Sequence, residues 1–309
     1  RVKRIKLEEA SFQQMCSECG YDEKKMRDKI FDIIKKRGKL HNPSTDSGGM
    51  LYGIVEEIGA AYGKKSLLKV GDEVLCLTSL TAIPLHLDEI REIDFNYSQM
   101  DVEGYSVVFD TSPLVLYPKD LKVSYTMSAM DESSSVFRVF QLAVRKKRFL
   151  ILGSDVLSVL IYASAIRKAV GSESRIVAVL DIKSIYTKAE VNKLLKSYVD
   201  EIYILDILTP LKSFEMIEKK EKELFDFSIN CANLLGAEAI SVLLTKNQGC
   251  IFVTSLINNY NRAILFAESL GKEVRTYSLD EYTNDYAEFT IELLREIKEK
   301  LERLDLVYQ

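Results

Sequence analysis

The chain has 309 residues, of which 47% are hydrophobic and 28% are charged, so it has the material for two domains with buried cores. The net charge of −4 argues against a protein that binds nucleic acid or an anionic membrane surface by electrostatic attraction. No run approaches about 18 apolar residues, which excludes a transmembrane helix, and the first residues lack the apolar core of a secretion signal. Five cysteines are few, and odd in number, for a disulfide framework, so we expect reduced thiols and a cytoplasmic location.

The first part of the chain predicts a small β-rich module. Residues 22–37 have the apolar spacing of an amphipathic helix, and Gly38 is a typical end for it. From residue 41 to about residue 117 the chain contains short strand-like runs bounded by glycine and aspartate, such as LYGIVEEIG and VGDEVLCLTSL. We therefore expect one leading helix followed by β-strands.

After residue 148 six apolar runs alternate with helix-length segments. The runs are FLILG, RIVAVLD, EIYILDI, FDFSINC, GCIFVTSL and EVRTYSL, and the expected helices cover about 156–170, 187–197, 211–223, 235–246 and 258–270. Near-continuous apolar runs are typical of strands buried on both faces of a parallel sheet, and the alternation implies right-handed crossovers. The predicted fold is therefore α/β, with a doubly wound Rossmann sheet beside the β-rich module.

The expected domain boundaries follow from these patterns. Residues 1–122 form the β-rich module and residues 123–277 form the Rossmann domain. The last segment, 278–309, is expected to form one helix from about residue 284. This helix carries an apolar stripe and should pack back to complete the first module.

The turn after the first Rossmann strand, Gly153-Ser154-Asp155-Val-Leu-Ser158, is a candidate dinucleotide site. Its fingerprint places glycine at three positions, for the tight turn, for the approach of the pyrophosphate and for helix–strand packing. This chain keeps Gly153, and Ser158 is small enough for the packing role. Asp155 instead brings bulk and negative charge to a helix N-terminus that would hold phosphate.

The second strand ends at Asp181, where a carboxylate can accept hydrogen bonds from the adenosine ribose and would repel a 2′-phosphate. Asp181 favours NAD over NADP as cofactor, although it is also possible that it only caps the strand. Other candidate cofactor residues follow the fourth and fifth strands at the same edge, and they are Asn230, Cys231, Thr254 and Ser255.

A polar, tightly turning loop runs from His41 to Gly49, and it is either a substrate-binding loop or an ordinary surface turn. Downstream, the stretch Gly53-Ile-Val-Glu-Glu-Ile-Gly59 followed by Val70-Gly-Asp-Glu-Val74 resembles the medium-chain dehydrogenase/reductase superfamily, which implies a GroES-like first module. Zinc-dependent members of that superfamily carry Gly-His-Glu where this chain has Gly48-Gly49-Met50, so the resemblance implies that catalytic zinc is absent.

The longer run HNPSTDSGGMLYG, from His41 to Gly53, together with LTSLTAIP further on, is similar to the L-erythro-3,5-diaminohexanoate dehydrogenase family. The resemblance implies NAD-dependent oxidative deamination of that diamino acid to 5-amino-3-oxohexanoate and ammonia, in lysine fermentation. It also implies a homodimer or a pairing with a sister subunit. The implied catalytic candidates are His41, Asp131 and Glu288, and the implied substrate-binding candidates are Asn42, Asp46, Ser47, Gly48 and Gly49.

Two interpretations stay open. In the first, the chain is a working dehydrogenase whose phosphate-binding turn tolerates Asp155. In the second, it is a degenerate paralogue that keeps the fold without binding cofactor and acts as a partner subunit or ligand-binding protein. The altered turn favours the second, and so does the loss of the family's Lys-Gly-His, replaced here by Asn284-Asp285-Tyr286. Asp181 and the intact loop at 41–49 favour the first.

Overall fold

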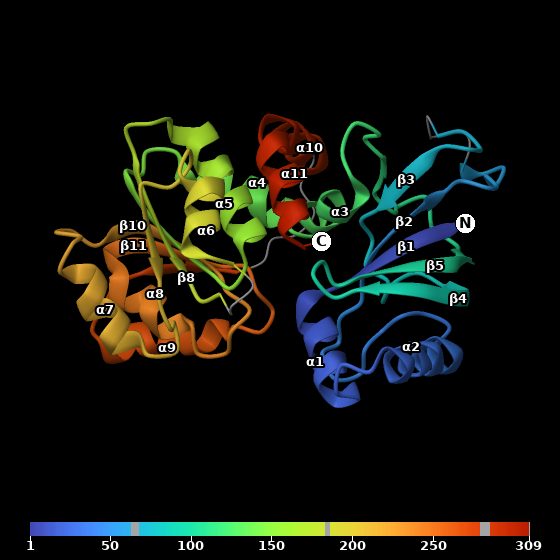
Figure 1. Ribbon diagram of the computed structural model, residues 1–309, viewed down its shortest axis with the longest axis horizontal. Helices are drawn as coiled ribbons and strands as arrows, with labels where there is room; N and C mark the ends of the chain where they lie inside the picture. Colours follow the sequence, from blue (N-terminus) through green and yellow to red (C-terminus); the bar gives the residue numbers. More distant parts are fainter. Residues whose placement is uncertain (63–67, 183–185, 279–284, 309) are drawn as a thin grey trace. The chain divides into compact units, whose positions relative to one another are not determined.

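The computed structural model describes residues 1–62, 68–182, 186–278 and 285–308. By contacts the chain divides into two compact units, Arg1–Asp131 and Glu132–Gln309 (Figure 1). No helix in the described ranges is both long enough and apolar enough to cross a bilayer. All five cysteines are buried free thiols.

Unit 1 is built on a six-stranded sheet in the order β4-β5-β1-β2-β3-β6, and every pairing in it is antiparallel. Its strands are β1 (Val2–Leu7), β2 (Gly49–Ile54), β3 (Glu73–Cys76), β4 (Leu85–Asp94), β5 (Gln99–Ser106) and β6 (Leu114–Leu116). Its helices are α1 (Glu9–Cys19), α2 (Glu23–Arg37) and α3 (Val123–Asp131). Phe12 of α1 and Met26 and Ile30 of α2 pack with Ile5 and Met100 of the sheet in one core.

The expected helix at 22–37 is confirmed as α2, with Asp22 capping its start and Gly38 ending it in the left-handed conformation. The expectation of one leading helix is wrong, because β1 and α1 come before α2. The register of β1 shifts between Val2 and Arg4 on both of its neighbours. This irregularity interrupts the apolar alternation by which a strand is recognised.

Unit 2 contains the predicted Rossmann sheet, with six parallel strands in the order β12-β11-β10-β7-β8-β9. The strands are β7 (Arg148–Gly153), β8 (Arg175–Leu180), β9 (Glu201–Ile204), β10 (Phe225–Cys231), β11 (Thr245–Val253) and β12 (Arg275–Tyr277). The intervening helices are α5 (Val156–Val170), α6 (Lys188–Leu195), α7 (Pro210–Glu218), α8 (Glu238–Leu244) and α9 (Tyr260–Ser269). All six predicted strands and all five predicted helices are confirmed.

Helices cover both faces of this sheet (Figure 1). Leu150 and Leu152 of β7 pack with Ile217 of α7 and Ile240 of α8 on one face. On the other face α5 contacts β7 and β8 and is flanked by α4 (Ser133–Ala143) and α6. Alternate residues of each strand are therefore buried under different helices, as the near-continuous apolar runs indicate.

The domain boundary differs from the expected one. It follows Asp131 at the end of α3 instead of residue 122, and the C-terminal segment packs within unit 2. That segment forms two helices, α10 (Tyr286–Glu296) and α11 (Lys298–Tyr308), separated at Ile297. The ring of Phe289 lies 5.2 Å and 4.6 Å from the rings of Phe137 and Phe140 of α4, and this aromatic contact holds α10 on its own unit.

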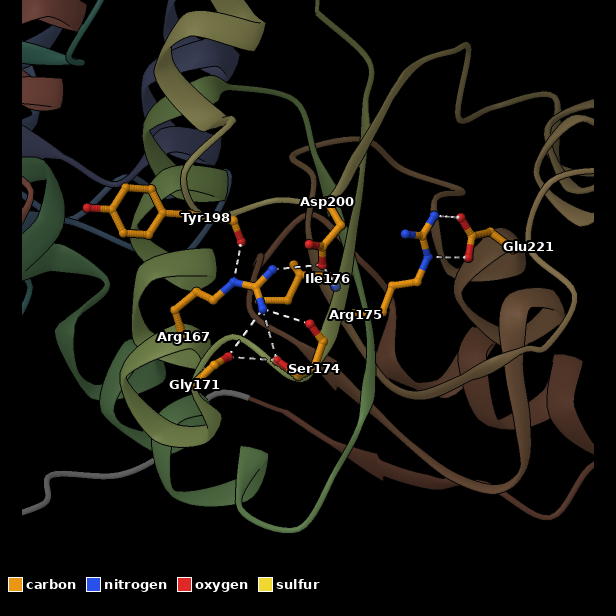
Figure 2. Close-up of polar contacts among 8 residues, drawn as sticks. All are labelled: Arg167, Gly171, Ser174, Arg175, Ile176, Tyr198, Asp200 and Glu221. Carbon is orange, nitrogen blue, oxygen red and sulfur yellow. Dashed lines mark hydrogen bonds and ion pairs between the residues drawn. The ribbon is translucent and has the colours of Figure 1, made fainter.

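At the amino ends of the parallel strands, hydrogen bonds of charged side chains link neighbouring elements (Figure 2). Arg167 of α5 donates to the backbone carbonyls of Tyr198, Gly171 and Ser174 and to the Asp200 carboxylate, at 2.7–3.2 Å. Asp200 also accepts a hydrogen bond from the amide of Ile176 at the start of β8. These contacts fix the end of α5 to the entries of β8 and β9.

Candidate functional site

The carboxyl edge of the same sheet gathers the predicted cofactor residues. Parallel pairing sets Cys231 beside Gly153, and Gly153 beside Leu180, while Asn230 pairs with Val253. The ends of β7, β8, β10 and β11 therefore lie side by side. Along this edge stand Gly153, Ser154, Asp155, Asp181, Asn230, Cys231, Thr254 and Ser255, with Ser158 in the first turn of α5.

The turn between β7 and α5 is fixed by its own side chains. A Cβ on Gly153 would overlap the Val159 side chain, so the glycine lets helix and strand pack closely. The Ser154 hydroxyl accepts a hydrogen bond from the amide of Asn233 at 2.9 Å. Asp155 is the N-cap of α5, and its Oδ1 accepts a hydrogen bond from the amide of Ser158 at 2.7 Å.

A second carboxylate, which the sequence did not single out, reaches the same turn. Glu132, the residue before α4, accepts a hydrogen bond from the Ser158 hydroxyl at 2.7 Å. Burial, with the charge of Glu132 adding to it, raises the pKa of the Tyr162 hydroxyl one turn further along α5 well above its usual value. Tyr162 is therefore neutral at physiological pH.

Cys231 is not a reactive thiol in this setting. Its Sγ lies 3.1 Å from the carbonyl oxygen of Leu152 and is buried at the end of β10. Burial raises the pKa of the Cys231 thiol well above its usual value, and the charges of Glu132 and Asp155 act in the same direction.

Asp181 takes part in the backbone structure of the edge. Its Oδ2 accepts a hydrogen bond from the amide of Ile207 at 3.0 Å, and its own amide donates to the carbonyl of Gly153. The strand-capping interpretation therefore has direct support. Asp181 Oδ1 makes no hydrogen bond to a described residue and can still accept one from a ribose hydroxyl.

Amides tie the ends of β10 and β11 together. Asn230 Oδ1 accepts hydrogen bonds from the Ala232 amide and from Asn258 Nδ2, both at 3.2 Å, and Asn233 Oδ1 accepts one from the Ser255 hydroxyl at 2.6 Å. The amide of Thr254 donates to the carbonyl of Asn230. Asn230 Nδ2 is buried without a partner among the described residues, so this donor remains available to a ligand or water.

In unit 1 the polar loop at 41–49 is held by a hydroxyl cluster, which we define as Ser11, Thr45 and Ser47 around the Glu8 carboxylate. Ser11 Oγ lies 2.5 Å from Thr45 Oγ1 and 2.6 Å from Ser47 Oγ. Glu8 Oε2 accepts hydrogen bonds from the Ser11 amide and the Ser47 hydroxyl. Asn42, only 1% exposed, donates to Gln14 at 2.9 Å and extends the network. These hydrogen bonds give the loop a defined structure.

Burial raises the pKa of the Glu8 carboxyl, which stands at the start of α1. The two glycines of the loop have backbone roles. Gly49 has a φ of 118°, and a Cβ on it would overlap the carbonyl oxygen of Lys6 on the paired strand. The carbonyl of Gly48 accepts a hydrogen bond from the Glu8 amide.

His41 has both ring nitrogens occupied. Its Nδ1 lies 3.3 Å from the Arg37 guanidinium and its Nε2 lies 3.1 Å from Asp46 Oδ1. Arginine can only donate, so Nδ1 is the acceptor and Nε2 carries the proton toward Asp46. The lone pair of His41 Nδ1, which a general base would need to accept a proton, is therefore already engaged by Arg37.

The three predicted catalytic residues are not brought together by any described contact. Asp131 forms an ion pair at 3.4 Å with Lys6, whose side chain is 7% exposed. Glu288 lies exposed in the first turn of α10, in the other unit from His41 and Asp131. No hydrogen bond or ion pair among the described residues links any two of the three. Within the described ranges no group of three His, Cys, Asp or Glu side chains is arranged to hold a metal ion.

Sequence reasoning missed Glu8, Lys6 and Glu132. Glu8 caps α1 in the structure, but glutamate is not a typical N-cap residue, so the local sequence did not identify it. Lys6 and Glu132 had no local signal, because their partners Asp131 and Ser158 are far away in the sequence.

Comparison with known proteins identifies relatives of this chain. The L-erythro-3,5-diaminohexanoate dehydrogenase N-terminal domain matches residues 1–118. Two curated relatives are named L-erythro-3,5-diaminohexanoate dehydrogenase, from Acetoanaerobium sticklandii and from Fusobacterium nucleatum. Each is 32% identical over 296 residues, which is 96% of this chain and 85% of the relative.

Solved structures share the fold at low identity. Glucose dehydrogenase from Haloferax mediterranei has a TM-score of 0.57 and 12% identity, covering 98% of this chain and 84% of its own. The CurK enoyl reductase has a TM-score of 0.55 and 16% identity, covering 98% of this chain and 77% of its own. These matches confirm the α/β dehydrogenase fold. From the identity to the two curated relatives, the chain belongs to the L-erythro-3,5-diaminohexanoate dehydrogenase family.

Proposed function

We propose that this chain is an oxidoreductase that oxidatively deaminates L-erythro-3,5-diaminohexanoate, giving 5-amino-3-oxohexanoate and ammonia, in the fermentation of lysine. The observation that carries the proposal is the 32% identity, over 96% of the chain, to relatives named for this substrate. The hydroxyl cluster adds support, because it gives the loop at 41–49 a defined structure.

A nicotinamide dinucleotide fits the carboxyl edge of the Rossmann sheet in three respects. Gly153 allows the close packing of α5, and Asp181 Oδ1 can accept a hydrogen bond from a ribose hydroxyl. Asn230 Nδ2 is a buried donor without a partner among the described residues. The cofactor supplies the hydride acceptor when it is bound. We propose NAD and not NADP, because the Asp181 carboxylate disfavours a 2′-phosphate. For the cofactor to bind, the hydrogen bond from the Ser158 amide to the Asp155 carboxylate must also break.

The chain's own residues bind the substrate and move protons. The reacting amine must lose its proton before carbon 3 is oxidised, so a proton acceptor is needed. We propose an acidic residue for this role, among Glu8, Asp131 and Glu288, because the accepting nitrogen of His41 already faces Arg37. Burial raises the Glu8 pKa toward the range in which a carboxylate accepts a proton.

The remaining features of the proposal follow from charge and composition. Acidic side chains suit the two ammonium groups of the substrate, and Lys6 suits its carboxylate. We propose that no catalytic zinc takes part, that the protein acts in the cytoplasm as a homodimer or with a sister subunit, and that neither nucleic acid nor a membrane is a partner. The net charge of −4 supports the absence of a nucleic-acid or membrane partner, and the five free thiols support the location.

The test is a direct assay of the purified chain. With diaminohexanoate and NAD we expect NADH and ammonia to form in equal amounts, and we expect slower formation with NADP. The matched control substrate is 5-aminohexanoate, which lacks the amine at carbon 3 and should give no NADH. Absence of turnover with either cofactor, over a range of pH, would contradict the proposal.

A second candidate function has one specific observation in its favour. The Asp155 carboxylate accepts the hydrogen bond of the Ser158 amide in the first turn of α5. This is expected of a paralogue that no longer binds cofactor. Such a protein would serve as a partner subunit or as a binder of the diamino acid. It would give heat on titration with diaminohexanoate and none with NADH.

A further inference from the structure

The first turn of α5 is already bound by two carboxylates of the chain itself. Asp155 approaches Ser158 from the N-cap and accepts from its amide, and Glu132 approaches from the start of α4 and accepts from its hydroxyl, each at 2.7 Å. Ser158 is only 6% exposed, so both hydrogen bonds end on a buried residue. After burial, both carboxylates also contribute to the raised pKa of the Cys231 thiol at the end of β10.

In a Rossmann fold the start of the helix after the first strand has a defined role in cofactor binding. The amides and the positive end of the helix dipole after the first strand are where a dinucleotide pyrophosphate is held. A carboxylate bound there satisfies the same groups that the phosphate would satisfy. Two carboxylates also repel a pyrophosphate, which carries two negative charges.

We propose that Asp155 and Glu132 together form a resident anion that competes with the dinucleotide pyrophosphate for the first turn of α5. This inference rests on the proposed function in that it takes a nicotinamide dinucleotide as the ligand of the sheet edge. It adds that, without cofactor, the first turn of α5 is occupied by the chain's own carboxylates. Cofactor affinity is therefore set by how readily Asp155 turns away and by the charge of Glu132.

The two residues can be separated by substitution. Asp155→Asn keeps an N-cap acceptor for Ser158 and removes the charge, whereas Asp155→Gly removes the charge, the cap and the bulk. Glu132→Gln keeps an acceptor for the Ser158 hydroxyl and removes the charge. The matched control is Asp22→Asn, because Asp22 Oδ1 caps α2 in unit 1 in the same way, at 3.0 Å from the amide of Lys25.

The experiment is calorimetric titration of each full-length variant with NADH. We expect Asp155→Asn and Glu132→Gln each to lower the Kd for NADH about tenfold or more, Asp155→Gly to lower it further, and Asp22→Asn to leave it unchanged. A Kd that stays within about twofold of the wild type in both charge-removing variants would overturn the inference, as would weaker binding or no binding in all variants. Melting temperatures of the unliganded variants establish that each is folded.

The failure of this inference and the failure of the proposed function give different results. Tightened NADH binding without any oxidation of diaminohexanoate supports the resident anion and overturns the proposed activity. Oxidation of diaminohexanoate by the wild type, with NADH affinity unchanged by the substitutions, supports the activity and overturns the resident anion.

Discussion

Arg175 donates two hydrogen bonds to Glu221, at 2.8 Å from Nε to Oε2 and at 2.5 Å from a terminal guanidinium nitrogen to Oε1 (Figure 2). Arg148 donates to Oε2 of the same carboxylate at 2.8 Å. The Glu221 side chain is 3% exposed, so one buried charge is neutralised by guanidinium groups at the starts of β7 and β8. The hydrogen bonds from Arg175, with those from Arg148, hold the pKa of Glu221 below its usual value.

Glu221→Gln should destabilise unit 2 by about 2–4 kcal/mol at pH 7, because it leaves two guanidinium groups without their buried counter-charge. A depressed carboxylate pKa adds stability above the pKa of the unfolded chain, and this contribution is lost as the pH falls through the folded value. The difference between variant and wild type should therefore shrink below about pH 4. Urea unfolding at neutral and acidic pH measures it. The exposed Glu218→Gln is the control, and an equal effect of the two substitutions would contradict the prediction.

Gly49→Ala should destabilise unit 1 by at least about 2 kcal/mol, because the residue has a φ of 118° and its Cβ would overlap the Lys6 carbonyl. Gly59→Ala is the matched control, since a Cβ there meets nothing within 4 Å. The chain has no tryptophan and 16 tyrosines, so tyrosine fluorescence can follow the urea transition. Equal transitions for both variants would show that β1 and β2 do not approach as described.

The neutral form of the His41 ring should carry its proton on Nε2, because Arg37 donates to Nδ1. Nitrogen-15 chemical shifts distinguish the two ring nitrogens. The chain has only two histidines, so His86→Asn leaves the His41 signals alone in the spectrum. Arg37→Ala should mix the two tautomers. A proton on Nδ1 in the parent protein would refute the assignment.

The five thiols should resist alkylation in the native protein, since all five are buried. Burial raises the pKa of the Cys16 thiol to about 11 and that of Cys231 well above its usual value, so little thiolate is present at neutral pH. Titration with an aromatic disulfide should give well under one thiol per chain before unfolding and five after it. Rapid reaction of one native thiol would identify a site with a lowered pKa.

The Rossmann sheet could be predicted because its information is local. Strands buried on both faces are continuous apolar runs, and they recur with helix-length spacers, so strands such as β7 (Arg148–Gly153) are recognised without knowledge of their partners. The edge on which Gly153, Asp181 and Asn230 lie followed from parallel pairing alone. The loop at 41–49 could be recognised because its residues, HNPSTDSGG, resemble those of a known family.

Contacts between distant residues could not be predicted. Glu132 is one of many acidic residues in the sequence, and only the folded chain sets its carboxylate against Ser158. The domain assignment of the C-terminal segment depended on where Phe289 packs, which its own amphipathic pattern does not specify. The division of that segment at Ile297 interrupts an apolar stripe that continues across it, so the pattern predicted one helix.

The separation of the ion pairs at the amino edge from the predicted cofactor residues at the carboxyl edge has an evolutionary consequence. Substitution of Asp155 at the carboxyl edge leaves the Arg–Glu contacts intact, because they lie at the other end of the sheet. An aspartate codon becomes a glycine codon by a single nucleotide change, so position 155 is one mutational step from the glycine of the fingerprint. We therefore expect an exchange of Asp155 for glycine to change the carboxyl edge while the fold persists.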